Sequence, residues 1–227
     1  MKIVIAGASG GVGWHLSNAF DRKYHHLILT YNTNKGGVLK PEKATHEIIQ
    51  CNFTVPDQVA AAFDGITGID VLINTMGTTA NSLVKDMVED EWNRVIESNL
   101  KTVFISCATL LKKMTPNGHI INMSSVLAAT GMIGASNYAA AKGGVESFTR
   151  SFAKEGLRVN VNVNAIALGY FDTGMGKDLP DAIKDFAMKR IPKRSFGDPS
   201  EIIKLVKYII STNYLVGQVI HLDGGLT

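Results

Sequence analysis

The stretch KIVIAGASGGVG, residues 2–13, joins a short apolar run to a glycine-rich turn. The run 2–6 predicts a buried strand, and Gly7, Gly11 and Gly13 follow it with the spacing G-x3-G-x-G. Glycine permits a tight turn and a close approach of the backbone to a phosphate. A helix that starts at this turn would present free N–H groups to the same phosphate. The stretch therefore predicts a dinucleotide-binding turn at the first strand-to-helix connection.

The rest of the chain repeats this alternation of short apolar runs and amphipathic stretches. The runs expected to be strands are 2–6, 26–31, 46–51, 70–74, 119–123, 158–168 and 218–222. The stretches expected to be helices are 12–22, 56–64, 88–114, 137–156 and 199–211. Apolar runs without polar alternation suit a parallel sheet that is covered on both faces. The order predicts an α/β fold with a Rossmann-type, doubly wound parallel sheet in a single domain, residues 1–227.

The composition is that of a compact globular protein. The chain has 227 residues, 45% of them hydrophobic, with a net charge of +3 and a mean hydropathy of +0.09. So small a charge does not argue for a nucleic-acid partner. The chain starts directly in a strand and has no apolar run of about 18 residues, so we expect neither a secretory signal nor a membrane span but a cytoplasmic protein. We expect no metal site among the six histidines, and reduced, buried thiols at Cys51 and Cys107.

One long segment, residues 174–198, lacks a regular pattern and is rich in glycine, proline and charge. A segment of this length inside a compact domain predicts a lid or substrate loop. Its basic residues are Lys177, Lys184, Lys189, Arg190, Lys193 and Arg194. They suit either a patch for an acidic carrier protein or phosphorylated substrate, or a solvated face, since Asp178, Asp181 and Asp185 interleave with them. The solvated face is the preferred interpretation.

The end of the second predicted strand bears on the choice of cofactor. Enzymes that use NAD usually have Asp or Glu at this position, which binds the ribose 2′-OH. Here the position is Tyr31, followed by Asn32 and, after two further residues, Lys35. No carboxylate is present to repel a 2′-phosphate, and Lys35 could accept one. The sequence therefore favours NADP, with NAD possible.

A tyrosine and a lysine four residues apart lie in SNYAAAKGG, residues 136–144. On a helix Tyr138 and Lys142 share a face, and a nearby ammonium lowers the pKa of a phenol from its usual value of about 10. Ser125, at the end of the predicted strand before this helix, could converge with Tyr138 on one substrate oxygen. The small residues between them suit close packing as well. Together the three side chains predict an acid/base device that acts on a carbonyl or alcohol.

These motifs, taken together, resemble the classical short-chain dehydrogenase/reductase family over nearly the whole chain. The family's glycine motif is matched with Ala6 in place of the usual threonine, and its N-N-A-G signature appears as NTMG, residues 74–77. The family's helix asparagine corresponds to Asn99. Its P-G motif appears as ALGYFDT, with Leu168 in place of proline and Thr173 retained.

The resemblance implies a role for each residue of the catalytic set. Tyr138 would be the general acid in reduction or the base in oxidation, and Ser125 would polarise the substrate carbonyl. Lys142 would lower the pKa of Tyr138 and bind the nicotinamide ribose. Asn99 would hold a water molecule in a proton relay.

The cofactor set follows from the glycine turn, the end of the second strand and the resemblance. Asn52 would contact the adenine, and Thr173 the carboxamide or the pyrophosphate. The full expected set is Gly7, Ser9, Gly11, Val12, Gly13, Tyr31, Asn32, Lys35, Asn52, Phe53, Asn74, Gly77, Tyr138, Lys142, Gly169 and Thr173.

The pattern is closest to 3-oxoacyl-(acyl carrier protein) reductases. It implies an NAD(P)-dependent oxidoreductase, a ketoreductase, that reduces a carbonyl of a small molecule or acyl-carrier substrate, or oxidises the alcohol. One alternative is an alcohol dehydrogenase or ketone reductase of another pathway. The other is a nucleotide-binding sensor without turnover, which would have no need of the acid Tyr138.

The predicted helix 88–114 carries more apolar residues than one buried stripe needs. The residues of this helix that fit a sheet-facing stripe are Val103, Phe104, Cys107, Leu110 and Leu111. The apolar surface is widened by Trp92 and Ile96 of the same helix and by Phe148 of the predicted helix 137–156. The family resemblance implies that this helix and 137–156 pair between subunits, giving a homodimer or homotetramer. The excess residues could instead lie under the 174–198 segment or be scattered on the surface.

Overall fold

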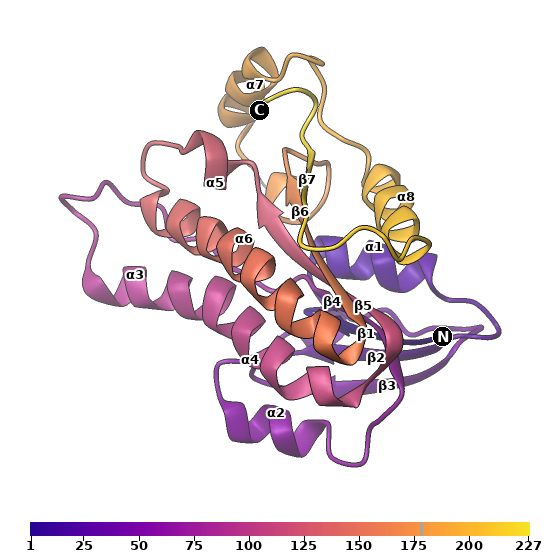
Figure 1. Ribbon diagram of the computed structural model, residues 1–227. Coiled ribbons are helices and arrows are strands. Elements are labelled where there is room, and N and C mark those ends of the chain that lie inside the picture. Colours follow the sequence, from indigo (N-terminus) through magenta and orange to yellow (C-terminus); the bar gives the residue numbers. More distant parts are fainter. Residues whose placement is uncertain (178) are drawn as a thin grey trace.

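The computed structural model describes residues 1–177 and 179–227, and its seven strands form one sheet (Figure 1). The strands are β1 (Lys2–Ala6), β2 (His26–Tyr31), β3 (Thr45–Gln50), β4 (Ile69–Asn74), β5 (Met114–Ser125), β6 (Val161–Leu168) and β7 (Val219–Leu222). Every neighbouring pair is parallel, in the order β3-β2-β1-β4-β5-β6-β7. The chain order reverses between β1 and β4, which is the switch point where ligands bind in doubly wound sheets.

Two apolar cores lie on opposite faces of the sheet because successive strand residues point to opposite sides. In β1, Ile3 and Ile5 join one core, whereas Val4 and Ala6 join the other. Helices α1 (Gly11–Ala19) and α8 (Pro199–Ile210) pack on the first core. Helices α2 (Pro56–Ala62), α4 (Thr102–Leu110) and α6 (Ser136–Gly156) pack on the second. Figure 1 shows α1 and α8 side by side, away from α4 and α6.

The remaining elements are short or interrupted. Helix α3 (Glu89–Ile96) runs through a π-helical segment, Glu97–Lys101, into α4. Helices α5 (Leu127–Thr130) and α7 (Asp181–Arg190) follow β5 and β6. The 3-10 turns are Lys35–Gly37, Leu111–Lys113, Leu157–Val159 and Gly174–Gly176. No helix in the described part of the chain is both long and apolar enough to span a lipid bilayer.

The structure corrects three expectations about local structure. Residues 174–198 are not irregular, because α7 occupies 181–190; Asp178 lies outside the described residues. Strand β5 begins at Met114, well before the expected start at 119, and passes through the turn-like residues Pro116 to Gly118. Phe104 does not face the sheet but is 53% exposed, since the other stripe residues of α4 already fill the core.

Candidate active site

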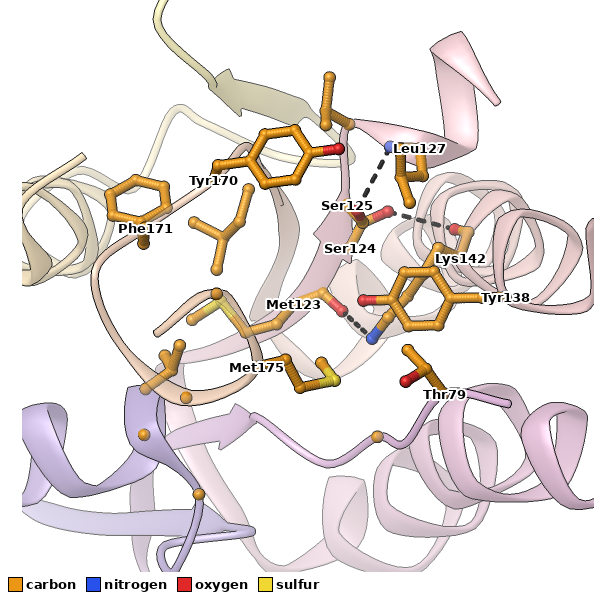
Figure 2. Close-up of a pocket in the computed structure, with 18 of the residues that line it drawn as sticks. Thr79, Met123, Ser124, Ser125, Leu127, Tyr138, Lys142, Tyr170, Phe171 and Met175 are labelled. Carbon is orange, nitrogen blue, oxygen red and sulfur yellow. Dashed lines mark hydrogen bonds between the residues drawn. The ribbon is translucent and has the colours of Figure 1, made fainter. Parts of the chain in front are cut away.

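A cavity of about 500 Å³ opens at the carboxyl ends of β1, β4, β5 and β6. Its lining includes the glycine turn at 9–12, the segment 75–77 after β4, the end of β5, and the segment 168–176 after β6. Tyr138 and Lys142 enter it from α6, as Figure 2 shows. The cavity therefore lies at the switch point of the sheet, where the sequence placed the ligand site.

The glycine turn is tightly built and leads directly into the N-terminus of α1. Gly7 has φ of +88°, a left-handed conformation that favours glycine, and a side chain at Gly13 would collide with the backbone of Gly7. Thr75 fastens the turn to β4, since its hydroxyl donates to the carbonyl oxygens of Ala6 (2.8 Å) and Gly7 (3.1 Å). No side chain caps the N-terminus of α1. The first-turn N–H groups of α1 are thus available to an anion.

The segment after β6 lies directly against this turn. A side chain at Gly11 would collide with Thr173 and Gly174. Thr173 itself is buried, and it precedes the short turn Gly174–Gly176, which also lines the cavity. The contact explains why Gly11 carries no side chain, and it places Thr173 beside the first turn of α1. Contact of Thr173 with a cofactor stays a prediction.

Three consecutive residues of β5 join the strand to α6. The backbone oxygen of Met123 accepts a hydrogen bond from Lys142 Nζ at 2.9 Å. The Ser124 hydroxyl donates to the buried Glu146 carboxylate (2.9 Å) and lies 3.2 Å from the backbone oxygen of Lys142. The Ser125 hydroxyl accepts from the backbone N–H of Leu127 at 3.2 Å, and it lies near enough to the Tyr138 hydroxyl to lower the pKa of that phenol. This set of contacts, which we call the β5–α6 junction, fixes the relative positions of the predicted catalytic side chains.

Burial dominates the electrostatics of the catalytic pair. It raises the pKa of Tyr138 to about 12, and the hydrogen bond with Ser125 only partly opposes the rise. It lowers the pKa of Lys142 to about 8, because a buried ammonium loses its hydration. Lys142 Nζ lies 5.6 Å from the centre of the Tyr138 ring, so the two share a helix face as predicted. The expected lowering of the Tyr138 pKa by Lys142 is not seen, because desolvation outweighs the nearby charge.

Asn99 occupies the π-helical segment and faces the cavity wall. Its amide nitrogen donates to the carbonyl oxygens of Val95 (2.9 Å) and Thr78 (2.8 Å), whereas its buried Oδ1 has no partner among the described residues. A side chain at Gly77 would collide with this Oδ1 and lie 3.5 Å from Lys142 Nζ. An unpaired buried acceptor is costly. Together with the π-helical insertion, which is common at functional sites, it agrees with the predicted water-holding role of Asn99.

Three residues of the predicted cofactor set are buried away from the cavity. Asn74 lies in a core network, where it donates to Asn122 (2.8 Å) and accepts from Ser106 (2.7 Å). Tyr31 and Phe53 are 8% and 3% exposed within the two apolar cores. These side chains therefore pack behind the site and do not line the cavity. Contact of these residues with a cofactor through their backbone atoms stays a prediction.

Other predicted residues lie at the adenosine end of the expected cofactor path. The turn that contains Lys35 packs on the glycine turn, since a side chain at Gly37 would press on the backbone oxygen of Ser9. Asn32 and Lys35 are exposed there. Asn52 Oδ1 accepts from the backbone and hydroxyl of Thr54, which leaves its amide nitrogen free to donate. The contacts of these residues with a cofactor stay predictions.

Several cavity residues were not predicted as site residues. They are mostly apolar and include Met76, Thr79, Met123, Leu127, Met132, Tyr170, Met175 and Leu179. Met123 had a usable signal, since it directly precedes the two serines at the end of a strand. The others lie in connecting segments, where hydrophobicity alone does not distinguish a cavity wall from ordinary packing.

A dinucleotide fits the residues that are present. The N-terminus of α1 offers uncapped N–H groups for a pyrophosphate. Gly11 and Gly13 leave no side chain in the way, and the buried Lys142 ammonium keeps two donors beyond its bond to Met123. When bound, a nicotinamide group would supply or accept the hydride in this cavity. Ser125 and Tyr138 line the same cavity, where both hydroxyls can meet a substrate oxygen.

Comparison with known proteins agrees with this geometry. The family model described as enoyl-(acyl carrier protein) reductase matches residues 7–227. The chain is 32% identical to a 3-oxoacyl-[acyl-carrier-protein] reductase of Vibrio cholerae, over 98% of this chain and 96% of that protein. It is 39% identical to the enzyme of the same name from Thermotoga maritima, over 77% and 74% of the two chains, and 34% identical to that of Staphylococcus aureus, over 98% and 96%.

The match covers both the glycine turn and the Ser125, Tyr138 and Lys142 set. It leaves no support for a nucleotide-binding sensor that lacks turnover. The chain belongs to the short-chain dehydrogenase/reductase family and is an NAD(P)-dependent oxidoreductase.

Proposed function

We propose that this enzyme reduces the keto group of a 3-oxoacyl chain carried as a thioester on an acyl carrier, with NADPH as the preferred cofactor. The observation that carries the proposal is the β5–α6 junction, which brings Ser125, Tyr138 and Lys142 to one mainly apolar cavity. The names of the relatives support the acyl-carrier substrate.

Tyr138 is suited to act as the acid in reduction. Because burial raises its pKa to about 12, the phenol stays protonated at neutral pH and can donate its proton to the alkoxide oxygen as it forms. The Ser125 hydroxyl lies beside it and donates to the same oxygen, which stabilises the developing negative charge. The hydride comes from the bound cofactor.

Lys142 is suited to return a proton to Tyr138 after each reduction. Its bond to the Met123 carbonyl fixes the ammonium, and its remaining donors face the wall formed by Gly77 and Asn99. Asn99 Oδ1, without a partner among the described residues, is suited to accept a hydrogen bond from a water molecule there. In the proposed relay, the Lys142 ammonium passes a proton toward the Tyr138 phenolate, which restores the acid. The neutral amine of Lys142 then takes a proton from that water, which solvent replaces.

The cavity wall supports an acyl substrate. Met123, Met132 and Met175 line it together with Leu127 and Leu168. Methionine side chains are flexible and polarisable, so they adapt to apolar chains of different shape. A wall of this kind suits an alkyl chain better than a sugar or another polar substrate.

The NADP preference rests on the adenosine end of the site. Asn32 and Lys35 are exposed beside the glycine turn, and neither is a carboxylate that would repel a 2′-phosphate. Because Tyr31 is buried, Asn32 is the position at which an acid would meet the ribose. We expect Asn32→Asp to shift the preference toward NADH, as measured by fluorescence titration with both cofactors; a wild-type preference for NADH would contradict the assignment.

Assembly into a homodimer or homotetramer is part of the proposal. Phe104 is 53% exposed and stacks edge-on against Phe148, with ring centres 6.3 Å apart, and Trp92 is 40% exposed on α3. These aromatic side chains lie on the helices that the sequence assigned to a subunit interface. Light scattering of the wild type and of Phe148→Glu tests this interface. We expect Phe148→Glu to dissociate, and a monomeric wild type would rule the interface out. The cytoplasmic location stays a prediction.

The direct test of the proposed function is a steady-state assay of the purified enzyme. We expect turnover of a 3-oxoacyl thioester with NADPH at a higher kcat/KM than with NADH. A panel of simple ketones and secondary alcohols serves as the comparison. Reduction of ketones without any reduction of 3-oxoacyl thioesters would overturn the substrate assignment and favour a ketone reductase of another pathway.

A further inference from the structure

A second, smaller cavity of about 120 Å³ adjoins the active-site cavity. The two share four lining residues, which are Val126, Leu127, Met132 and Tyr170. The smaller one is completed by Thr130, Gly131, Arg190 and Leu226. It therefore continues the active site toward the C-terminal end of α7 and the end of the chain.

Arg190 and Tyr170 line this small cavity, and among the described residues neither side chain has an oxygen partner; Arg190 is exposed to solvent. Arg190 is the one charged residue that lines it, and its guanidinium carbon lies 5.6 Å from the centre of the Phe186 ring. Among the described residues, no carboxylate lies within ion-pair distance of Arg190. The Tyr170 hydroxyl reaches only the Met132 sulfur, at 3.8 Å. A thioether is a weak acceptor, so both groups are ready for an oxygen ligand.

The small cavity lies close to the reacting centre. The backbone N–H of Leu127 donates to the Ser125 hydroxyl oxygen at 3.2 Å, and Leu127 also lines the small cavity. Figure 2 shows the Tyr170 hydroxyl directed toward Ser125 and Leu127. A substrate whose keto oxygen meets Ser125 and Tyr138 can therefore place a second oxygen, a few bonds away, near Tyr170 and Arg190.

We propose that Arg190 and Tyr170 form a subsite for the carboxyl-derived oxygen of the substrate, either the thioester carbonyl of a 3-oxoacyl chain or the free carboxylate of a 3-oxo acid. Guanidinium groups match carboxyl oxygens in charge and geometry, and charge-assisted bonds are the stronger ones. The subsite selects 3-oxoacyl compounds over plain ketones because only they carry this second oxygen. This inference rests on the proposed function, which it makes more specific.

Kinetics with three matched compounds test the subsite. They are the N-acetylcysteamine thioester of 3-oxooctanoate, freshly prepared 3-oxooctanoate, and 2-heptanone, which is the same ketone without the carboxyl group. For each carboxyl compound we take the ratio of its kcat/KM to that of 2-heptanone. In Arg190→Met we expect this ratio to fall about tenfold for the thioester and by a larger factor for the free acid. Tyr170→Phe should lower both ratios by a smaller factor, about threefold.

Lys189→Met is the control, because it removes an equal charge from the same helix at a residue that lines neither cavity. The subsite would be overturned if Arg190→Met lowered kcat/KM by the same factor for all three compounds. It would also be overturned if Lys189→Met changed the ratios of kcat/KM as much as Arg190→Met does. If kcat/KM falls by a larger factor for the free acid than for the thioester, the carboxylate is the better ligand of the subsite. If kcat/KM falls by the same factor for both, the subsite binds the carbonyl oxygen that they share.

A second measurement separates the subsite from the proposed function. Hexanoate should inhibit the reduction of 2-heptanone by the wild type, and its inhibition constant should rise about tenfold in Arg190→Met. An unchanged inhibition constant would overturn the subsite. If the wild type reduces 2-heptanone but neither 3-oxooctanoyl compound, the proposed function falls, while the hexanoate experiment still decides whether the subsite exists.

Discussion

The two walls of the active-site cavity are built differently. At the β5–α6 junction Ser124, Tyr138 and Lys142 are all less than 10% exposed, and hydrogen bonds between strand and helix hold Ser124 and Lys142. On the opposite wall Met175 is 50% exposed, and on nearby α7 Phe186 is 57% exposed. We therefore expect the chemistry to reside on the rigid, buried wall and substrate selection on the loosely packed, more exposed one.

The largest effect should come from the rigid wall. Tyr138→Phe removes the acid but keeps the ring packed against α3, so kcat should fall by about 10²–10⁴-fold while cofactor affinity stays nearly unchanged. Stopped assays with NADPH and cofactor titration measure the two quantities. Tyr208→Phe is the matched control, because Tyr208 is an exposed tyrosine of α8. Turnover of Tyr138→Phe close to that of Tyr208→Phe would remove Tyr138 from the mechanism.

The junction should also be important for stability. Ser124→Ala removes the hydroxyl that donates to Glu146, and among the described residues it leaves this buried carboxylate with the Arg150 contact at 3.5 Å. We expect the free energy of unfolding to fall by about 1–3 kcal/mol, because a buried polar group loses its partner. Urea unfolding measures this. Ser211→Ala, which removes an exposed hydroxyl bonded to Tyr208, should change it little; equal losses would show that the junction adds no rigidity.

The pH dependence of reduction should report the buried lysine. The pKa of Lys142 is lowered to about 8, so its ammonium is present below pH 8 and is lost as the pH rises above it. If the charge is needed to restore the acid, kcat/KM of the free enzyme falls above about pH 8. Lys142→Arg keeps its charge at higher pH, so the residual activity of that variant should not show this fall. A fall at the same pH in Lys142→Arg would assign the titration to another group.

The sequence predicts the sheet well because its strands are buried on both faces. The apolar runs 2–6 and 26–31 match β1 and β2 at both ends. Helix α7 was missed because its apolar residues, among them Ile183 and Phe186, are exposed and give no clear stripe. The early start of β5 was missed because Pro116 and Gly118 are typical turn residues. Both misses concern segments whose structure depends on tertiary neighbours.

The candidate site was predictable where spacing along one element fixes geometry. Tyr138 and Lys142 are four residues apart on one helix, so their proximity follows from helical periodicity. Spacing does not show how deeply a side chain is buried. The sequence therefore predicted a lowered pKa for Tyr138, whereas burial raises it. The sequence also could not show that Tyr31 points into a core, since either face of a fully buried strand is apolar. Tyr170 belongs to a family motif, but its pairing with Arg190 arises only in three dimensions.

The smallest effect should come from the loosely packed wall. Met175 lines the cavity yet is half exposed, so Met175→Ala should change the free energy of unfolding by no more than about 0.5 kcal/mol. It removes apolar contact with an acyl chain, so KM for a long-chain 3-oxoacyl thioester should rise a few-fold, with less change for a short one. Met123→Ala is the matched variant on the rigid wall; Met123 is 5% exposed, and its loss should cost about 2–5 kcal/mol. If the two variants were equally destabilised, the two walls would be equally rigid, and selectivity could not be assigned to the segment after β6.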